Sequence, residues 1–133
     1  MLEPVRTIEL FQKPPDPQLF TPGSPIFQAG QRGDVIYGVI SGEVEIVVNG
    51  KVVETILPGD IFGSGAILHL DHQRASTAMA KTDSLLGFLE RERFMFAVEQ
   101  TPMFALEVMK SYSDRLRRLR RIVAAQDGDL PNS

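Results

Sequence analysis

The 133-residue sequence has no cysteine and no tryptophan, and it has only two histidines. Without cysteine there is no disulfide framework, no thiolate zinc site and no thiol nucleophile. No apolar run approaches the roughly 18 residues that a membrane-spanning helix requires, and the N-terminus lacks the pattern of a signal peptide. We therefore expect a soluble, cytoplasmic protein with no membrane partner.

Basic residues are also in the minority, with 14 Lys and Arg against 17 Asp and Glu, for a net charge of −3. General affinity for nucleic acid requires a basic excess, so we do not expect this chain alone to bind nucleic acid. The chain is 43% apolar and 23% charged, which is typical of a globular domain. Its length predicts one domain with a well-formed core.

Prolines limit regular structure in residues 1–24, which we interpret as a lead-in that lies on the core. Val5, Ile8, Leu10 and Phe11 fit one short amphipathic helix. A longer helix is excluded because proline interrupts helical hydrogen bonding. The prolines that follow are Pro14, Pro15, Pro17, Pro22 and Pro25.

Short apolar runs separated by turn residues fill residues 25–90. Val44, Ile46 and Val48 alternate with other residues, and Asn49-Gly50 joins them to the run 51–56. Asn-Gly between two such runs is the strongest short-range hairpin signal. Roughly eight strands at this spacing predict a mainly β protein with some α structure, an antiparallel β-roll of the jelly-roll barrel type.

The remaining residues predict helices over 91–126 and a flexible tail over 127–133. A short helix fits 91–98, and Thr101-Pro102 suits the N-cap and first position of a long helix that continues to Gln126. Apolar positions along the long helix alternate in steps of four and three, as in a heptad seam. They are Ala105, Met109, Tyr112, Leu116, Leu119 and Val123.

This seam predicts a two-fold homodimer. We assign the interface to Met109, Tyr112, Leu116, Leu119 and Val123. Phe104 and Val108 lie on another face, where they are available to pack on the barrel. The alternative is that Leu116 and Leu119 fold back on the barrel themselves. The arginines around the distal seam are interpreted as the solvated flank of the dimer, since no aromatic residues interleave with them.

Gly63-Ser64-Gly65 is followed at once by a short apolar run, and Arg74 comes ten residues after Ser64. Glycines allow the backbone to approach a phosphate closely. The free N–H groups at a helix start favour an anion, and a guanidinium can grip two of its oxygens. These are the parts of an anion pocket. The alternative is a simple strand-to-helix turn with a surface arginine, which has the same sequence pattern.

An ordered set of residues followed by the long helix resembles the cyclic nucleotide-binding domain family, which includes the sensor half of catabolite-activator and fumarate-nitrate regulators. The set is Phe27, Gly30, Gly33-Asp34, Tyr37, Ser41 to Val44, Pro58 to Asp60, Phe62-Gly63, Arg74 and Thr77. The resemblance implies a β-roll with a phosphate-binding cassette, and a regulatory sensor that relays binding of a cyclic nucleotide (cAMP or cGMP), or of another small anion, to the dimerising helix. The implied ligand-binding residues are Phe62, Gly63, Ser64, Gly65, Ala66, Arg74 and Ala75.

Two cassette positions depart from that family. Ser64 stands where the family has a glutamate that accepts a hydrogen bond from the ribose 2′-hydroxyl, and Gly65 stands where it has a branched apolar residue. Loss of such a hydrogen bond costs about 1.5–3 kcal/mol, or roughly ten- to a hundredfold in affinity. The alternative function is therefore a ligand-free dimerisation or interaction module with a degenerate pocket.

We expect neither an enzyme nor a metal site. His69 and His72 flank Asp71, but the metal sites of the similar cupin barrels take histidines from separate strands, and we interpret these as loop histidines. The Gly-x-Ser-x-Gly nucleophile elbow is absent. No catalytic residue and no cofactor are therefore predicted.

Overall fold

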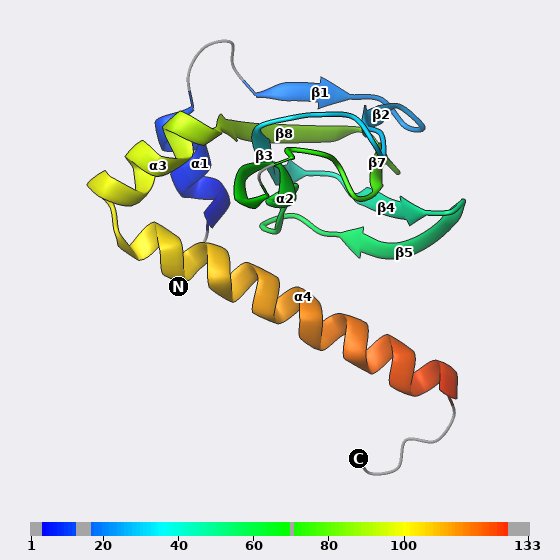
Figure 1. Ribbon diagram of the computed structural model, residues 1–133. Coiled ribbons are helices and arrows are strands. Elements are labelled where there is room, and N and C mark those ends of the chain that lie inside the picture. Colours follow the sequence, from blue (N-terminus) through cyan, green and yellow to red (C-terminus); the bar gives the residue numbers. More distant parts are fainter. Residues whose placement is uncertain (1–3, 13–16, 70, 128–133) are drawn as a thin grey trace.

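The strands form two antiparallel sheets in a computed structural model that describes residues 4–12, 17–69 and 71–127 (Figure 1). The first four-stranded sheet has the order β1 (Gln18–Phe20), β8 (Ser84–Glu90), β3 (Val35–Ser41) and β6 (Ile61–Phe62). The second has the order β2 (Pro25–Phe27), β7 (Thr77–Ala80), β4 (Val44–Val48) and β5 (Lys51–Ile56). The predicted antiparallel β-roll is confirmed.

The predicted hairpin joins β4 to β5. Val48 pairs with Lys51, so Asn49 and Gly50 form the turn. Both have positive φ, 50° for Asn49 and 77° for Gly50, which is the region that these two residue types tolerate best. The turn residues thus set the pairing next to the turn, and the register of the two strands shifts farther along, between Ile46 and Val47.

The first 24 residues contribute both a helix and a strand. The short helix α1 (Pro4–Phe11) buries Val5 and Ile8. It lies over β3 and β8 at Gly38 and Gly87, where an added Cβ would come within 3.1 Å of these side chains. Strand β1 pairs with β8, so the roll begins before residue 25, where we had expected it to start.

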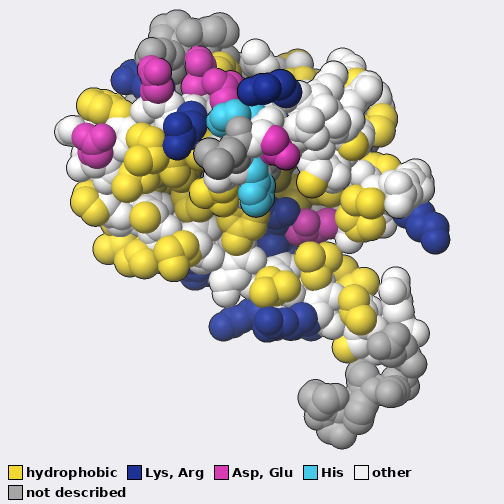
Figure 2. Space-filling model, in the orientation of Figure 1, with side chains coloured by type: hydrophobic (Ala, Val, Ile, Leu, Met, Phe, Trp, Pro, Cys, Tyr) yellow, Lys and Arg dark blue, Asp and Glu magenta, His cyan; other side chains and the backbone are white. Residues whose placement is uncertain are grey.

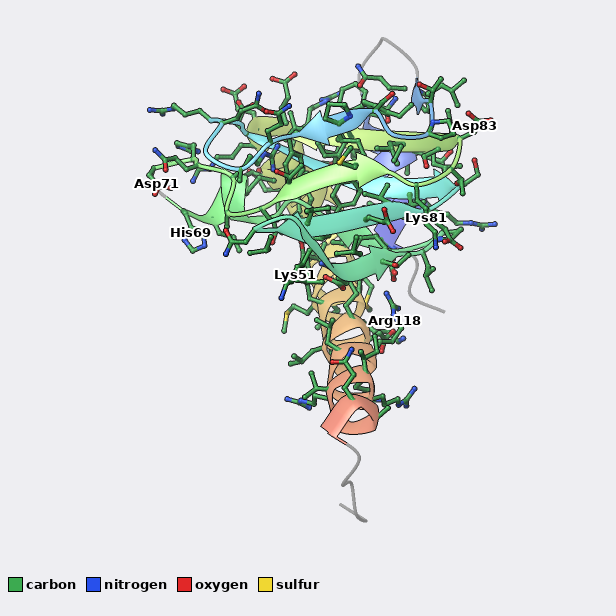
Figure 3. All side chains as sticks on the ribbon, turned by 90° about the vertical axis from the view of Figure 1, so that its right-hand side faces the viewer. Lys51, His69, Asp71, Lys81, Asp83 and Arg118 are labelled. Atoms are coloured by element: carbon green, nitrogen blue, oxygen red, sulfur yellow. The ribbon has the colours of Figure 1, made fainter. Side chains whose placement is uncertain are left out.

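Two helices follow the roll, α3 (Arg91–Gln100) and α4 (Met103–Asp127), and a single turn, α2 (Gly65–Leu68), follows β6. Fully buried Phe104 anchors the first turn of α4 in the core cluster that contains Ile8 and Ile36. Beyond this anchor, α4 runs under the roll and then away from it (Figures 1 and 3). Residues 128–133 of the predicted tail lie outside the described residues.

None of the described helices is long and apolar enough to cross a membrane.

Candidate functional site

Arg74 points into the roll and is only 6% exposed. Its Nη1 donates to the carbonyl oxygen of Gly63 at 3.0 Å, and its Nη2 donates to that of Val35 at 2.9 Å. The centre of its guanidinium lies 4.0 Å from the ring centroid of Phe27. The arginine is therefore held at a fixed place by two neutral acceptors and an aromatic face.

Arg74 forms no ion pair with a carboxylate in the part of the chain that the structure describes, since none of the ion pairs there includes it. Burial lowers the pKa of Arg74, and electrostatic interactions with Tyr37, Asp34 and Tyr112 oppose this shift. A guanidinium nevertheless stays protonated in proteins. The interior of the roll thus contains a positive charge that no carboxylate pairs with.

Two glycines leave room for this guanidinium. A Cβ at Gly33 would lie 2.9 Å from Arg74 Nη2, and one at Gly63 would lie 2.9 Å from Nη1. Gly63 also has a φ of +88°, which disfavours any other residue. A side chain at either position would displace the arginine.

Arg74 lines a cavity of about 170 Å³. The lining residues are Phe27, Ile46, Phe62, Gly63, Ser64, Gly65, Gln73, Arg74, Ala75, Ser76, Tyr112 and Arg115. The structure thus gathers six of the seven residues that the sequence proposed, from Phe62 to Gly65 with Arg74 and Ala75, around one cavity. Ala66 follows in α2, and its side chain is not among those described.

Sequence reasoning did not find the contribution of α4 to this cavity. Tyr112 and Arg115 both line it, and the hydroxyl of Tyr112 accepts a 3.1 Å hydrogen bond from the backbone N–H of Ser64. We had assigned Tyr112 only to the dimer seam and Arg115 only to its solvated flank. The heptad pattern carries no signal for this second role, because the bonded partners lie 48 residues apart in the sequence.

Arg115 and Arg118 fasten α4 to the roll. The Nε and Nη2 of Arg115 donate to the two carboxylate oxygens of Glu54 at 2.7 and 2.8 Å, and its Nη1 donates to the carbonyl of Ile61 at 2.6 Å. Arg118 pairs with Asp60 at 2.5 Å. Figure 2 shows basic and acidic side chains meeting between the roll and the long helix, and Figure 3 shows Arg118 on α4 below the roll.

The Arg115–Glu54 pair is nearly buried, with side-chain exposures of 11% and 10%. Burial lowers the pKa of Arg115, but its hydrogen bonds and electrostatic interactions with Glu54 and Tyr112 together outweigh this effect, and the pKa is raised overall. A bidentate pair of this kind combines charge with fixed geometry. It therefore sets the position of α4 against β5 and β6.

Of the remaining residues assigned to the dimer seam, Met109, Leu116 and Val123 are 64%, 48% and 55% exposed. Leu119 is partly buried beside a groove of about 290 Å³ that also includes Leu116. Figure 2 shows apolar side chains along the distal part of the long helix, with basic ones along its edge. The homodimer stays a prediction.

His69 and Asp71 are exposed at one edge of the roll, where Figure 3 shows them at its outer tip. The N–H of Gln73 donates to Asp71 Oδ1 at 3.1 Å. The described residues contain no group of three or more His, Cys, Asp or Glu side chains that could hold a metal ion.

Comparison with known proteins identifies a family for the part of the chain that contains the roll and Arg74. The sequence model of the family described as "Cyclic nucleotide-binding domain" matches residues 17–101. The chain belongs to the cyclic nucleotide-binding domain family. The match includes the whole roll and every predicted ligand-binding residue, and it ends before α4.

Relatives of this cyclic nucleotide-binding domain include parts of larger proteins. The chain is 30% identical over 104 residues to the Pycsar effector protein XpPycTIR of Xanthomonas perforans, covering 78% of the chain and 34% of that protein. It is 32% identical over 114 residues to a cGMP-dependent protein kinase of Eimeria tenella, covering 86% of the chain and 11% of the kinase. The chain thus spans about a third or less of the length of these curated relatives.

Among solved structures, the catabolite activator protein of Thermus thermophilus superposes with a TM-score of 0.69 at 26% identity, over 96% of this chain and 60% of that one. This similarity supports the same two-sheet roll followed by a long helix.

Proposed function

We propose that this domain is a regulatory sensor module, and not a catalyst, that binds a cyclic nucleotide or another small anion in the cavity beside Arg74. The observation that carries the proposal is the buried guanidinium of Arg74, which has no ion-pair partner among the described residues. An unpaired buried charge is costly. A bound phosphate would supply the missing negative charge in charge-assisted hydrogen bonds.

The walls of the cavity suit such a ligand. Phe27 and Phe62 offer apolar surface, Gln73 and Ser76 offer polar groups, and no Asp or Glu is among the described residues that line the cavity. An anion there would meet no like charge. Membership of the family, and a relative named as a cGMP-dependent kinase, favour cAMP or cGMP over other anions.

Isothermal titration with cAMP, cGMP and linear 5′-AMP tests the site. We expect Arg74→Met to weaken cyclic nucleotide binding by at least about tenfold, the value of one charge-assisted hydrogen bond. Arg91→Ala is the matched control, since Arg91 is exposed at the start of α3. Binding that is independent of Arg74 would contradict the site assignment.

We further propose that binding is relayed through α4 to a homodimer formed along Met109, Leu116, Leu119 and Val123. The exposure of Met109, Leu116 and Val123 supports this, because exposed apolar residues in heptad spacing favour pairing with a second helix.

The same exposed seam favours a second candidate, a dimerisation module that takes no ligand. The cavity of about 170 Å³ is also smaller than the roughly 300–1,000 Å³ of typical ligand sites. Thermal unfolding with a nucleotide panel separates the two candidates. A ligand at a hundred times its dissociation constant stabilises the fold by about 2.7 kcal/mol, whereas the second candidate predicts no shift.

A further inference from the structure

One polar face of α4 is bonded to the wall of the cavity. We call it the docking face, and it consists of Ser111, Tyr112, Arg115 and Arg118. Their spacing places them on one side of a helix. Ser111 Oγ accepts a hydrogen bond from the N–H of Ile61 at 3.2 Å, and Tyr112 accepts the bond from Ser64 described above. The contacts therefore reach strand β6 and the turn that follows it.

The ion pairs extend this contact to two further segments. Arg115 holds Glu54 on β5, and Arg118 holds Asp60, which lies just before β6 and also accepts a bond from the N–H of Leu57. Each ion pair forms only when α4 holds one particular position against the roll. A sliding or tilting of the helix would break them together, so the docked position is one defined state.

Docking makes α4 part of the wall of the cavity and uses one of the hydrogen-bond donors there. Tyr112 and Arg115 form part of the lining, and the Ser64 N–H points at the Tyr112 hydroxyl. A backbone amide has one hydrogen to donate. A ligand oxygen that takes this hydrogen bond must displace the tyrosine.

We propose that α4 is a built-in competitor of the ligand, in which the Tyr112 hydroxyl occupies the Ser64 amide and the Arg115–Glu54 pair keeps it there. This inference rests on the proposed function. If the ligand binds only when the docking face is released, its apparent affinity equals its intrinsic affinity multiplied by the fraction of molecules that are undocked. Binding then shifts the population toward released α4. A helix that merely capped the ligand would have the opposite effect, since its contacts would add to affinity.

Tyr112→Phe is the sharpest test, because it removes only the hydroxyl and keeps the ring that lies 4.6 Å from the Arg115 guanidinium. We expect titration with cAMP and cGMP to show binding about threefold to tenfold tighter than in the wild type, the value of one hydrogen bond. Glu54→Gln is expected to tighten binding in the same direction. Asp114→Asn is the matched control, because the hydrogen-bonded pair that it breaks, with Lys110 on α4, is exposed and makes no contact with the roll. Unchanged or weaker binding in Tyr112→Phe would overturn the proposal.

A ligand-free measurement separates this inference from the proposed function. Amide hydrogen exchange followed by NMR is expected to be about fivefold faster at Ser64 in Tyr112→Phe than in the wild type or in Asp114→Asn. An unchanged rate would show that the hydroxyl does not occupy this amide. If neither the wild type nor any variant binds cAMP or cGMP, the assignment of a cyclic nucleotide ligand fails and the competition with that ligand fails with it. The exchange rates at Ser64 still show whether α4 docks.

Discussion

Arg74 and Arg115 line the same cavity and are both largely buried, but their surroundings are opposite. Arg115 is paired through two nitrogens with Glu54, whereas Arg74 donates to two backbone carbonyls and lies over the rings of Phe27 and Tyr37. Accordingly, burial lowers the pKa of Arg74, while the pKa of Arg115 is raised despite burial, because its interactions with Glu54 and Tyr112 together outweigh the desolvation. The comparison teaches that one buried arginine is neutralised by a carboxylate and holds α4, whereas the other forms no ion pair among the described residues.

The largest effect on stability is expected from Glu54→Ala, which leaves Arg115 without its partner. We expect a loss of about 3 kcal/mol in the free energy of unfolding, measured by urea denaturation, because an uncompensated buried charge is costly. The control is Glu43→Ala, which removes an exposed pair with Lys81 and should cost at most about 1 kcal/mol. Equal losses would show that the Arg115 pair is no more than a surface contact.

Removing the Arg74 charge should cost less than removing the partner of Arg115. In the absence of ligand, Arg74→Met loses two hydrogen bonds but also relieves the desolvation of an unpaired charge. Its side chain can still pack on the Phe27 ring. We expect a loss of about 1 kcal/mol in urea unfolding. A loss as large as that of Glu54→Ala would mean that Arg74 is a structural residue like Arg115.

A methyl group added next to the Arg74 guanidinium should affect stability differently from one added elsewhere on the cavity wall. Gly33→Ala places a Cβ 2.9 to 3.2 Å from three guanidinium atoms, and overpacking of this kind costs about 1 kcal/mol or more. In Gly65→Ala the new Cβ makes only an ordinary 3.5 Å contact with His69, and alanine favours the α2 turn. That variant should gain about 0.5 kcal/mol in thermal unfolding. We expect Gly33→Ala to lower the free energy of unfolding and Gly65→Ala to raise it. A change of the same sign in both variants would contradict this account of the site.

The smallest effect on monomer stability is expected from a substitution of Leu116, which follows Arg115. Leu116 is 48% exposed, so Leu116→Glu should change the unfolding free energy of the monomer by no more than about 0.5 kcal/mol. It should nevertheless reduce the sedimentation coefficient if the seam forms a homodimer. Ser113→Glu adds the same charge at an exposed position outside the seam. If Leu116→Glu has the same sedimentation coefficient as the wild type, the seam does not form a dimer interface.

Local signals predicted most of the fold. Asn49-Gly50 specified a hairpin because both residues accept positive φ, and the uninterrupted apolar pattern after Pro102 specified a long helix. Strand β1 escaped detection because three residues among prolines carry no periodicity, and only pairing with β8 stabilises it. The short spacing between Gly63 and Arg74 indicated a shared site, and the structure places them in direct contact.

The sequence by itself determined most of the segments that become strands and helices, and it predicted which glycines and which arginine share a site, because these properties depend on residues close together in the chain. Only the tertiary structure decided that Tyr112 turns toward Ser64 and that Arg115 pairs with Glu54, a residue 61 positions away. A heptad repeat gives the faces of a helix, but the choice between a partner helix and the roll depends on where distant carboxylates and amides lie.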